Sequence, residues 1–241
     1  MSIFGLHLTH GLALTLLVPL APLLWAQGVH TRRKTPVLPE PPGPRSGRAG
    51  AGPVLRLLIA GDSAAAGVGV DHQDEALCGQ LQALLTPRFD LQWELIARTG
   101  HTTADLLECL HATPPRPLDV VVLSLGVNDV TGLVPLRRWM QQQRALATLL
   151  KQRFEARQVL VAAVPPMGQM LAMPQPLRWV MGRRAALLNA ALAHALRDQG
   201  HCQILHLPPT GLPGALARDG FHPGAATYRA WADEAARALK D

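Results

Sequence analysis

From Leu55 onward, short apolar runs alternate with longer segments of helical pattern, and this alternation limits the folds open to the chain. The apolar runs have the length and the boundaries of buried parallel strands, and we expect strands at 55–60, 92–97, 120–125, 159–164 and 204–207. Helices are expected at 74–85, 103–111, 135–153, 177–198 and 225–239. Strands that alternate with helices are joined by right-handed crossovers into a parallel sheet. The pattern therefore predicts an α/β protein, a single three-layer α/β/α domain with a mainly parallel five-stranded sheet.

An apolar stretch, residues 3–26, precedes this domain. At ~1.5 Å per residue it is just long enough to cross a hydrocarbon core of roughly 30 Å. No Lys or Arg stands before it, and no clean small-x-small cleavage site lies near Ala26, so a retained segment is favoured over a cleaved signal peptide. We expect residues 1–28 to form an apolar helix that is a membrane anchor or an uncleaved signal-like helix.

Residues 29–53 are rich in Pro, Gly and Arg and are expected to form a basic linker before a globular domain at 54–241. Up to residue 53 there are five basic residues and one acidic residue, which leaves 18 basic and 16 acidic residues in the domain. This uneven distribution favours a membrane surface over nucleic acid as the partner of the basic segment. The positive charges follow the apolar stretch, which places the domain on the cytoplasmic side by the positive-inside tendency.

Ser63 follows the first expected strand, in the string Gly61-Asp62-Ser63. Ligands of open α/β sheets bind at the carboxyl ends of strands, so this hydroxyl is a candidate nucleophile. The structural alternative is a helix N-cap, for which serine is a favoured residue.

Asp219 and His222 stand three residues apart, just before the last expected helix. A serine nucleophile needs an adjacent base, and that base needs a group that orients it. An Asp and a His on one loop can supply both, although a lone His is more often structural than catalytic.

Two further residues follow strand-like runs. The side-chain amide of Asn128 could donate to a developing oxyanion, or Asn128 could instead form an Asx-turn. Gly100 would allow a ligand to approach the backbone closely, or it could be an ordinary turn glycine.

In this order, the four blocks around Ser63, Gly100, Asn128 and His222 resemble those of the SGNH hydrolases, the GDSL-type lipases and esterases. The resemblance runs from about residue 54 to the C-terminus and departs from the family pattern at Ala64, where leucine is usual. It implies a catalytic triad of Ser63, His222 and Asp219. It also implies an oxyanion site formed by the backbone N–H groups of Ser63 and Gly100 and the side chain of Asn128.

The resemblance implies a serine hydrolase that cleaves carboxylic esters or thioesters of lipid-like or acyl substrates through an acyl-enzyme. A carbohydrate O-acetyl esterase is the near alternative, and a non-catalytic membrane-tethered binding module is the alternative from another class. No cofactor is expected, and three dispersed cysteines without a C-x-x-C pair indicate no metal site. Many hydrolases of this kind act outside the cytoplasm, which conflicts with the charge rule, so the membrane side stays open.

Four methionines lie between residues 165 and 181, after the fourth expected strand. Methionine is adaptable and suits apolar surfaces that accept varied partners. Met167, Met170 and Met173 are therefore candidates for a mobile wall that binds an acyl chain longer than acetyl, with core packing as the alternative.

Overall fold

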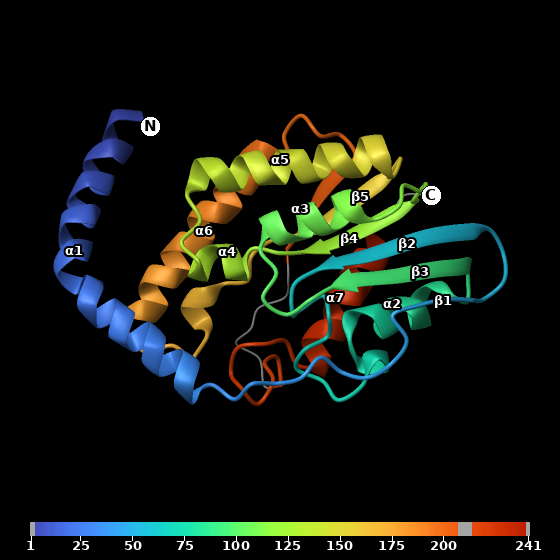
Figure 1. Ribbon diagram of the computed structural model, residues 1–241, viewed down its shortest axis with the longest axis horizontal. Helices are drawn as coiled ribbons and strands as arrows, with labels where there is room; N and C mark the ends of the chain where they lie inside the picture. Colours follow the sequence, from blue (N-terminus) through green and yellow to red (C-terminus); the bar gives the residue numbers. More distant parts are fainter. Residues whose placement is uncertain (1–2, 207–213, 240–241) are drawn as a thin grey trace.

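The apolar runs lie together in one sheet with helices on both faces (Figure 1). The computed structural model of the chain describes residues 3–206 and 214–239. Within these residues the sheet has six strands in the order β1-β3-β2-β4-β5-β6. The strands are β1 (Ser46–Ala49), β2 (Val54–Gly61), β3 (Asp90–Ala97), β4 (Val120–Ser124), β5 (Gln158–Ala162) and β6 (Cys202–Leu205).

Five of these strands correspond to the five expected ones and run parallel. The predicted α/β/α class and the mainly parallel sheet are confirmed, while the end of the last expected strand, Leu207, lies outside the described residues. The predicted strand count was too low. The additional strand, β1, comes from the expected linker and pairs antiparallel with β3.

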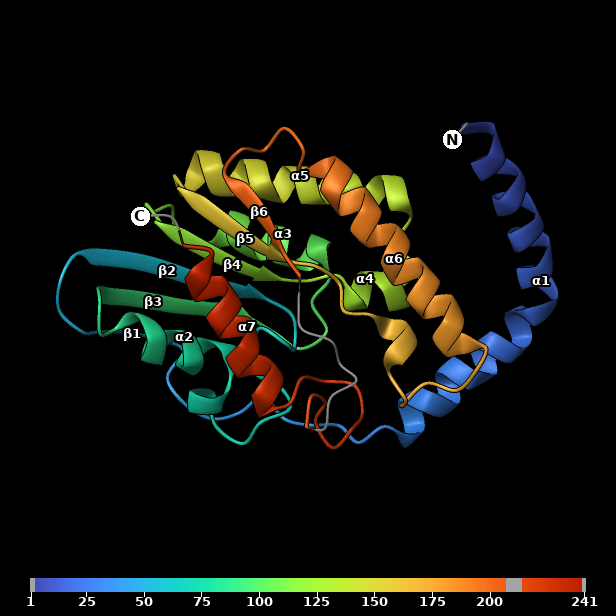
Figure 2. The same cartoon turned by 180° about the vertical axis from the view of Figure 1, so that it is seen from behind.

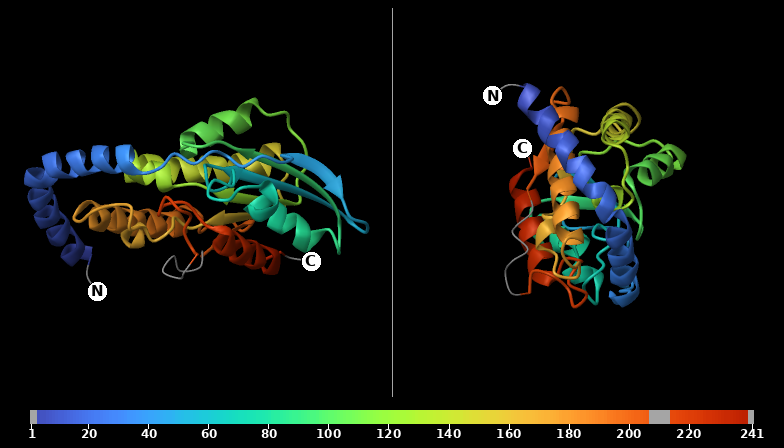
Figure 3. Two further views of the ribbon diagram at one scale, coloured as in Figure 1. Left: turned by 90° about the horizontal axis from the view of Figure 1, so that it is seen from below. Right: turned by 90° about the vertical axis from the view of Figure 1, so that its left-hand side faces the viewer.

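Helices cover both faces of the sheet, as Figure 2 and the left view of Figure 3 show. One core lies beneath α3 (Thr103–Ala112), α5 (Leu136–Arg153) and α6 (Leu177–Ala195). The other lies beneath α2 (Leu77–Leu85) and α7 (Ala225–Arg237). Because successive side chains of a strand point to opposite faces, β2 contributes Leu58 and Ala60 to the first core and Leu57 and Ile59 to the second. Three short elements complete the described fold: η1 (Gln73–Glu75), α4 (Val127–Thr131) and η2 (Met167–Gln169).

Helix α1 (Ile3–Lys34) projects from this body (Figure 1). Its end towards the domain is attached to the start of α6 through Gln27. The side-chain amide of Gln27 donates to the Gln175 carbonyl at 2.7 Å and accepts from the Leu177 N–H at 3.1 Å. Within the part of the chain that the structure describes, no helix combines the length and the apolarity that crossing a membrane requires.

Candidate active site

Ser63 lies on the turn that follows β2, at the point where the strand order reverses. The chain passes from β2 to β3 on one side and then to β4 on the other, and ligands of open α/β sheets bind in the crevice at such a switch point. The register places Gly61 opposite Ser124 of β4 and Ala97 of β3. The turn is held by backbone hydrogen bonds from Val68 N–H to the Ser63 carbonyl, at 2.9 Å, and from Asp62 N–H to the Ser124 carbonyl, at 3.0 Å.

The structure brings Ser63, His222 and Asp219 into one hydrogen-bonded chain. His222 Nε2 is 3.0 Å from Ser63 Oγ, and His222 Nδ1 is 2.6 Å from Asp219 Oδ2. The second contact fixes the Nδ1–H tautomer of a neutral imidazole, because a carboxylate only accepts. Nε2 is then free to accept a proton from the hydroxyl, which is the geometry that a serine nucleophile requires.

Asp219 is held in place by its own loop. Its Oδ1 atom accepts the backbone N–H groups of Phe221 and His222, each at 3.0 Å, and its side chain is fully buried. Burial by itself raises the pKa of this carboxyl, but the hydrogen bonds from His222 and Phe221 outweigh burial and hold the pKa below its usual value. Asp219 is therefore ionised when the imidazole takes up a proton.

Asp62, the residue before Ser63, is a second buried carboxyl at this turn, and no role was expected for it from the sequence. Its Oδ1 accepts the Ala64 N–H at 3.0 Å and the Ser124 hydroxyl at 3.4 Å. Burial raises its pKa from 3.8 to about 7, and these two hydrogen bonds only partly compensate. The signal for it was present in the Gly61-Asp62-Ser63 string, which places a carboxyl at a buried strand end.

Gly100, on the loop after β3, and Asn128, in the short helix after β4, follow strands at the same edge of the sheet. Gly100 has a φ of +90°, and a Cβ at this position would meet no atom within 4 Å, so the space on this side of its Cα is open. Asn128, on α4, donates one side-chain N–H to the His101 carbonyl at 2.9 Å. A second amide hydrogen remains on the same nitrogen. The described contacts thus tie Asn128 to the Gly100 loop, whereas neither residue borders the cavity beside Ser63.

A further buried carboxyl, Asp129 of α4, binds Thr103 at the start of α3; no role was expected for it from the sequence. It accepts the hydroxyl of Thr103 at 2.9 Å and the Thr103 N–H at 3.2 Å, and Gln143 donates to the same hydroxyl at 3.0 Å. Burial raises the pKa of Asp129 despite these hydrogen bonds. The effect is to fix α4, and with it Asn128, against the start of α3.

A cavity of about 50 Å³ lies beside Ser63 and His222. Its walls are mostly apolar and include Leu125, Val127, Ala162, Met170, Leu216, Phe221 and Trp231. It adjoins a larger hollow of about 450 Å³, with which it shares Ala163 and Pro165 and which is bordered by Trp179 and Arg183. The site thus combines a narrow apolar space with a wider, more polar one.

The three methionines of the expected acyl-binding wall are buried. Met167, Met170 and Met173 have exposed fractions of 0%, 2% and 4% and belong to the core beneath α6. Only Met170 borders the small cavity. η2, which contains Met167, lies against α6, and Met173 follows on the chain segment that joins the two. Met167 and Met173 thus have the buried environment that the core-packing alternative predicts.

The described residues contain no group of three or more His, Cys, Asp or Glu side chains that could hold a metal ion. Cys78 and Cys202 are thiols whose pKa values burial raises to about 11 and about 12. Such thiols are protonated at neutral pH and are poor nucleophiles.

The three-layer fold, the strand-end serine and its Asp-His partner are together typical of a serine hydrolase. Residues 59–230 match the model of the GDSL-like lipase/acylhydrolase family. Since this match covers more than half of the chain, the protein belongs to that family and is an ester-hydrolysing enzyme.

The chain is also similar to a curated relative, and it shares its fold with solved structures. The GDSL-like esterase Rv1075c of Mycobacterium tuberculosis is 27% identical over 242 residues, which cover 91% of this chain and 76% of the relative. The crystal structure of TesA superposes with a TM-score of 0.60 at 22% identity, over 76% of this chain and 97% of TesA. Axe2, an acetylxylan esterase from Geobacillus stearothermophilus, superposes with a TM-score of 0.55 at 19% identity, over 80% of this chain and 98% of Axe2.

Proposed function

We propose that this enzyme hydrolyses carboxylic esters through an acyl-enzyme formed on Ser63. The observation that carries the proposal is the continuous hydrogen-bonded chain from Ser63 through His222 to Asp219, at 3.0 and 2.6 Å. Ser63 Oγ attacks the ester carbonyl while His222 Nε2 takes its proton. The imidazolium, stabilised by Asp219, then protonates the leaving alcohol, and a water molecule deacylates the serine by the same two steps. The backbone N–H groups of Ser63 and Gly100 and the free amide hydrogen of Asn128 are the proposed oxyanion donors.

The size of the cavity beside Ser63 supports a short acyl group. A cavity needs roughly 10–15 Å³ to hold one water molecule, so about 50 Å³ admits a chain of a few carbons. The adjoining hollow of about 450 Å³ can accept a much larger alcohol. We therefore infer a preference for short acyl chains, from acetyl to about butyryl, on bulky leaving groups.

A carbohydrate O-acetyl esterase is the second candidate, because a small acyl site next to a wide hollow fits an acetylated sugar. Axe2, which shares the fold, is an acetylxylan esterase. Hydrolysis of acetylated xylan at a rate comparable with that of p-nitrophenyl acetate would favour the carbohydrate O-acetyl esterase. Activity confined to simple esters would favour a general esterase.

The mechanism is tested with p-nitrophenyl esters of increasing chain length and with Ser63→Ala. We expect kcat/KM to be highest between acetyl and butyryl and to fall for octanoyl and longer chains.

Ser63→Ala should lower kcat by roughly 10⁴-fold or more, because a triad member acts as part of a unit, and it should no longer react with a fluorophosphonate probe. A variant that keeps more than a few per cent of the activity would exclude Ser63 as the nucleophile.

We also propose that the N-terminal helix brings the enzyme to an anionic membrane surface. Two observations support this. The last turn of α1 carries Arg32, Arg33 and Lys34, and the same helix exposes 74% of Trp25 and 46% of Leu23. Each basic residue near an anionic surface contributes about 1 kcal/mol, so changing all three to Gln should weaken binding to phosphatidylglycerol vesicles by roughly 100-fold. Sedimentation with vesicles measures this, and equal binding to neutral phosphatidylcholine vesicles would contradict the proposal.

A further inference from the structure

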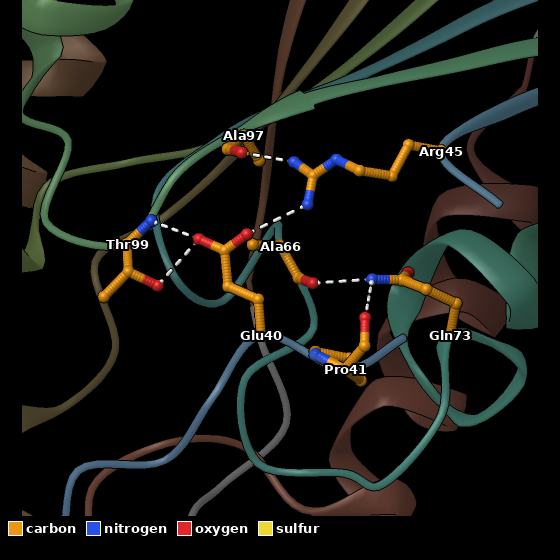
Figure 4. A network of polar contacts seen from close by, with 7 residues as sticks. All are labelled: Glu40, Pro41, Arg45, Ala66, Gln73, Ala97 and Thr99. Atoms are coloured by element: carbon orange, nitrogen blue, oxygen red, sulfur yellow. Dashed lines mark hydrogen bonds and ion pairs between the residues drawn. The ribbon is translucent and has the colours of Figure 1, made fainter. Parts of the chain in front are cut away.

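A short segment before β1, residues 40–45, binds the Gly100 loop directly and is linked through Gln73 to the turn that carries Ser63. It lies outside the region that matches the family model, residues 59–230. Figure 4 shows its polar contacts: Glu40 and Arg45 face the end of β3 and Thr99, while Pro41 faces Gln73 and the turn after Ser63.

Glu40 binds the residue that immediately precedes Gly100. One carboxylate oxygen, Oε1, accepts both the backbone N–H of Thr99 at 2.7 Å and the Thr99 hydroxyl at 2.9 Å. Two hydrogen bonds to a single oxygen fix the orientation of Thr99 around its Cα atom. The only backbone rotation left between this anchor and the N–H of Gly100 is ψ of Thr99.

The Gly100 loop needs such an anchor because it is exposed. Gly100 has no atom within 4 Å of its Cβ position, so side-chain packing does not hold it. Arg98 N–H donates to the Gly61 carbonyl at 3.2 Å, and the Asn128 side chain donates to the His101 carbonyl at 2.9 Å. A turn hydrogen bond from the His101 N–H to the Arg98 carbonyl, at 3.1 Å, closes the loop across Thr99 and Gly100. Glu40 adds the side-chain anchor inside this turn and so fixes how the turn is oriented.

Arg45 in turn holds Glu40. Its Nη1 atom lies 3.0 Å from the second carboxylate oxygen, Oε2, and its Nη2 donates to the carbonyl of Ala97, the last residue of β3. Partial burial raises the pKa of Glu40, but the hydrogen bonds from Thr99 and the charge of Arg45 outweigh burial and lower the pKa below its usual value. The carboxylate is therefore ionised and accepts hydrogen bonds at neutral pH.

The same segment reaches the nucleophile turn through Gln73. The buried side chain of Gln73 donates to the Ala66 carbonyl at 2.8 Å and to the Pro41 carbonyl at 3.4 Å, and its backbone N–H donates to Pro42 at 3.0 Å. Through Gln73, the segment of residues 40–45 thus joins the Gly100 loop to the turn that begins at Ser63.

We propose that Glu40 is a positioning residue for the oxyanion site: through Thr99 it aims the backbone N–H of Gly100 towards the ester oxygen bound at Ser63. The proposal rests on the assignment of Gly100 as an oxyanion donor. It adds that the geometry of this donor depends on a residue from outside the matched family region. An oxyanion donor acts mainly in the transition state, so its displacement affects kcat more than KM.

The test uses the full chain with Glu40→Ala and p-nitrophenyl acetate. Complete removal of an oxyanion donor costs roughly 10²- to 10³-fold in kcat, and a displaced donor costs less. We expect Glu40→Ala to lower kcat about tenfold per fluorophosphonate-titrated site, with KM within about twofold of wild type. Glu40→Gln keeps an oxygen that can accept from Thr99 and should recover kcat to within about threefold of wild type.

Asp90→Asn is the matched control. This variant breaks the ion pair between Arg48 of β1 and Asp90 of β3. Like the Glu40 contact, the pair attaches the chain before β2 to β3, but it lies at the opposite end of β3 from Gly100. Asp90→Asn should leave kcat within about twofold of wild type, and thermal melting of every variant shows whether it is folded. The proposal is overturned if Glu40→Ala leaves kcat unchanged, if its effect falls on KM, if Asp90→Asn causes the same loss, or if Glu40→Gln is as slow as Glu40→Ala. In each case Ser63→Ala still decides separately whether the chain is a serine esterase.

Discussion

At the scale of single residues, two buried carboxyls near Ser63 differ in how their charge is compensated. Asp219 accepts the imidazole N–H and two backbone N–H groups, and its pKa is lowered. Asp62 accepts one backbone N–H and one distant hydroxyl, and burial raises its pKa to about 7. The number of good hydrogen-bond donors decides whether the pKa is raised or lowered, because each donor favours the ionised carboxylate while burial disfavours it.

The raised pKa of Asp62 predicts a pH-dependent cost in stability. In the unfolded chain an Asp ionises near pH 3.9, whereas here it ionises near 7. The group therefore destabilises the fold increasingly as the pH rises from about 4 to about 7, by up to about 4 kcal/mol at 1.36 kcal/mol per pH unit. The Asn side chain of Asp62→Asn is uncharged at every pH. The free energy of unfolding of this variant should therefore equal that of wild type at about pH 4 and exceed it most near pH 8.

Urea denaturation of both proteins at these two pH values measures the difference. An equal gain at both pH values would mean that packing or hydrogen bonding, rather than ionisation, separates Asp62 from Asn.

At the scale of elements, β1 shows how a polar segment becomes part of the sheet. Its four residues, Ser46 to Ala49, are exposed and carry no apolar pattern. The strand forms because the outer edge of β3 offers backbone donors and acceptors. In the pairing of β1 with β3, Ala49 lies opposite Leu91 and Ser46 lies opposite Glu94. Just before β1, the Arg45 carbonyl accepts the Leu95 N–H at 2.7 Å. This pairing carries Glu40 and Arg45 to the end of β3. The expected linker therefore contains a segment that belongs to the fold.

At the scale of the whole molecule, the site depends on contact between the Ser63 turn and the His222 loop, whose residues lie 159 positions apart in the sequence. Gly69 lies between them. It has a φ of +117°, and a Cβ there would lie 2.2 Å from the Pro223 carbonyl oxygen and 3.3 Å from Cβ of His222. A side chain at this position would be strained in its own backbone and would push the His222 loop away from the serine turn.

Gly69→Ala should therefore lower kcat by at least about tenfold, since a displacement of about 1 Å can cost 10²-fold, and should also lower the melting temperature. Gly200→Ala is the control, because its Cβ would meet no atom within 4 Å. Steady-state kinetics and thermal melting of both variants measure the effect. If Gly69→Ala were as active as Gly200→Ala, the close approach of the two loops would not matter for catalysis.

The sequence by itself determined the elements whose signal is local. Apolar runs bounded by turn residues predicted the five parallel strands, and the strand-end positions of Ser63, Gly100 and Asn128 followed from them. The Asp219-x-x-His222 spacing placed the two partners on one loop. These features are readable because each depends on the chemistry of a few neighbouring residues.

Only the tertiary structure decided the features that depend on long-range contact. Strand β1 exists because β3 has a free edge, and Met167 and Met173 are core residues because η2 folds against α6. Asp62 and Asp129 acquire raised pKa values through burial by distant elements, and Glu40 reaches Thr99 across 59 residues of chain. The physical reason is the same in each case: segments far away in sequence make the environment of these side chains. The local pattern can place a residue such as Asp62 at a strand end, but it does not give the contacts and the burial that the residue acquires there.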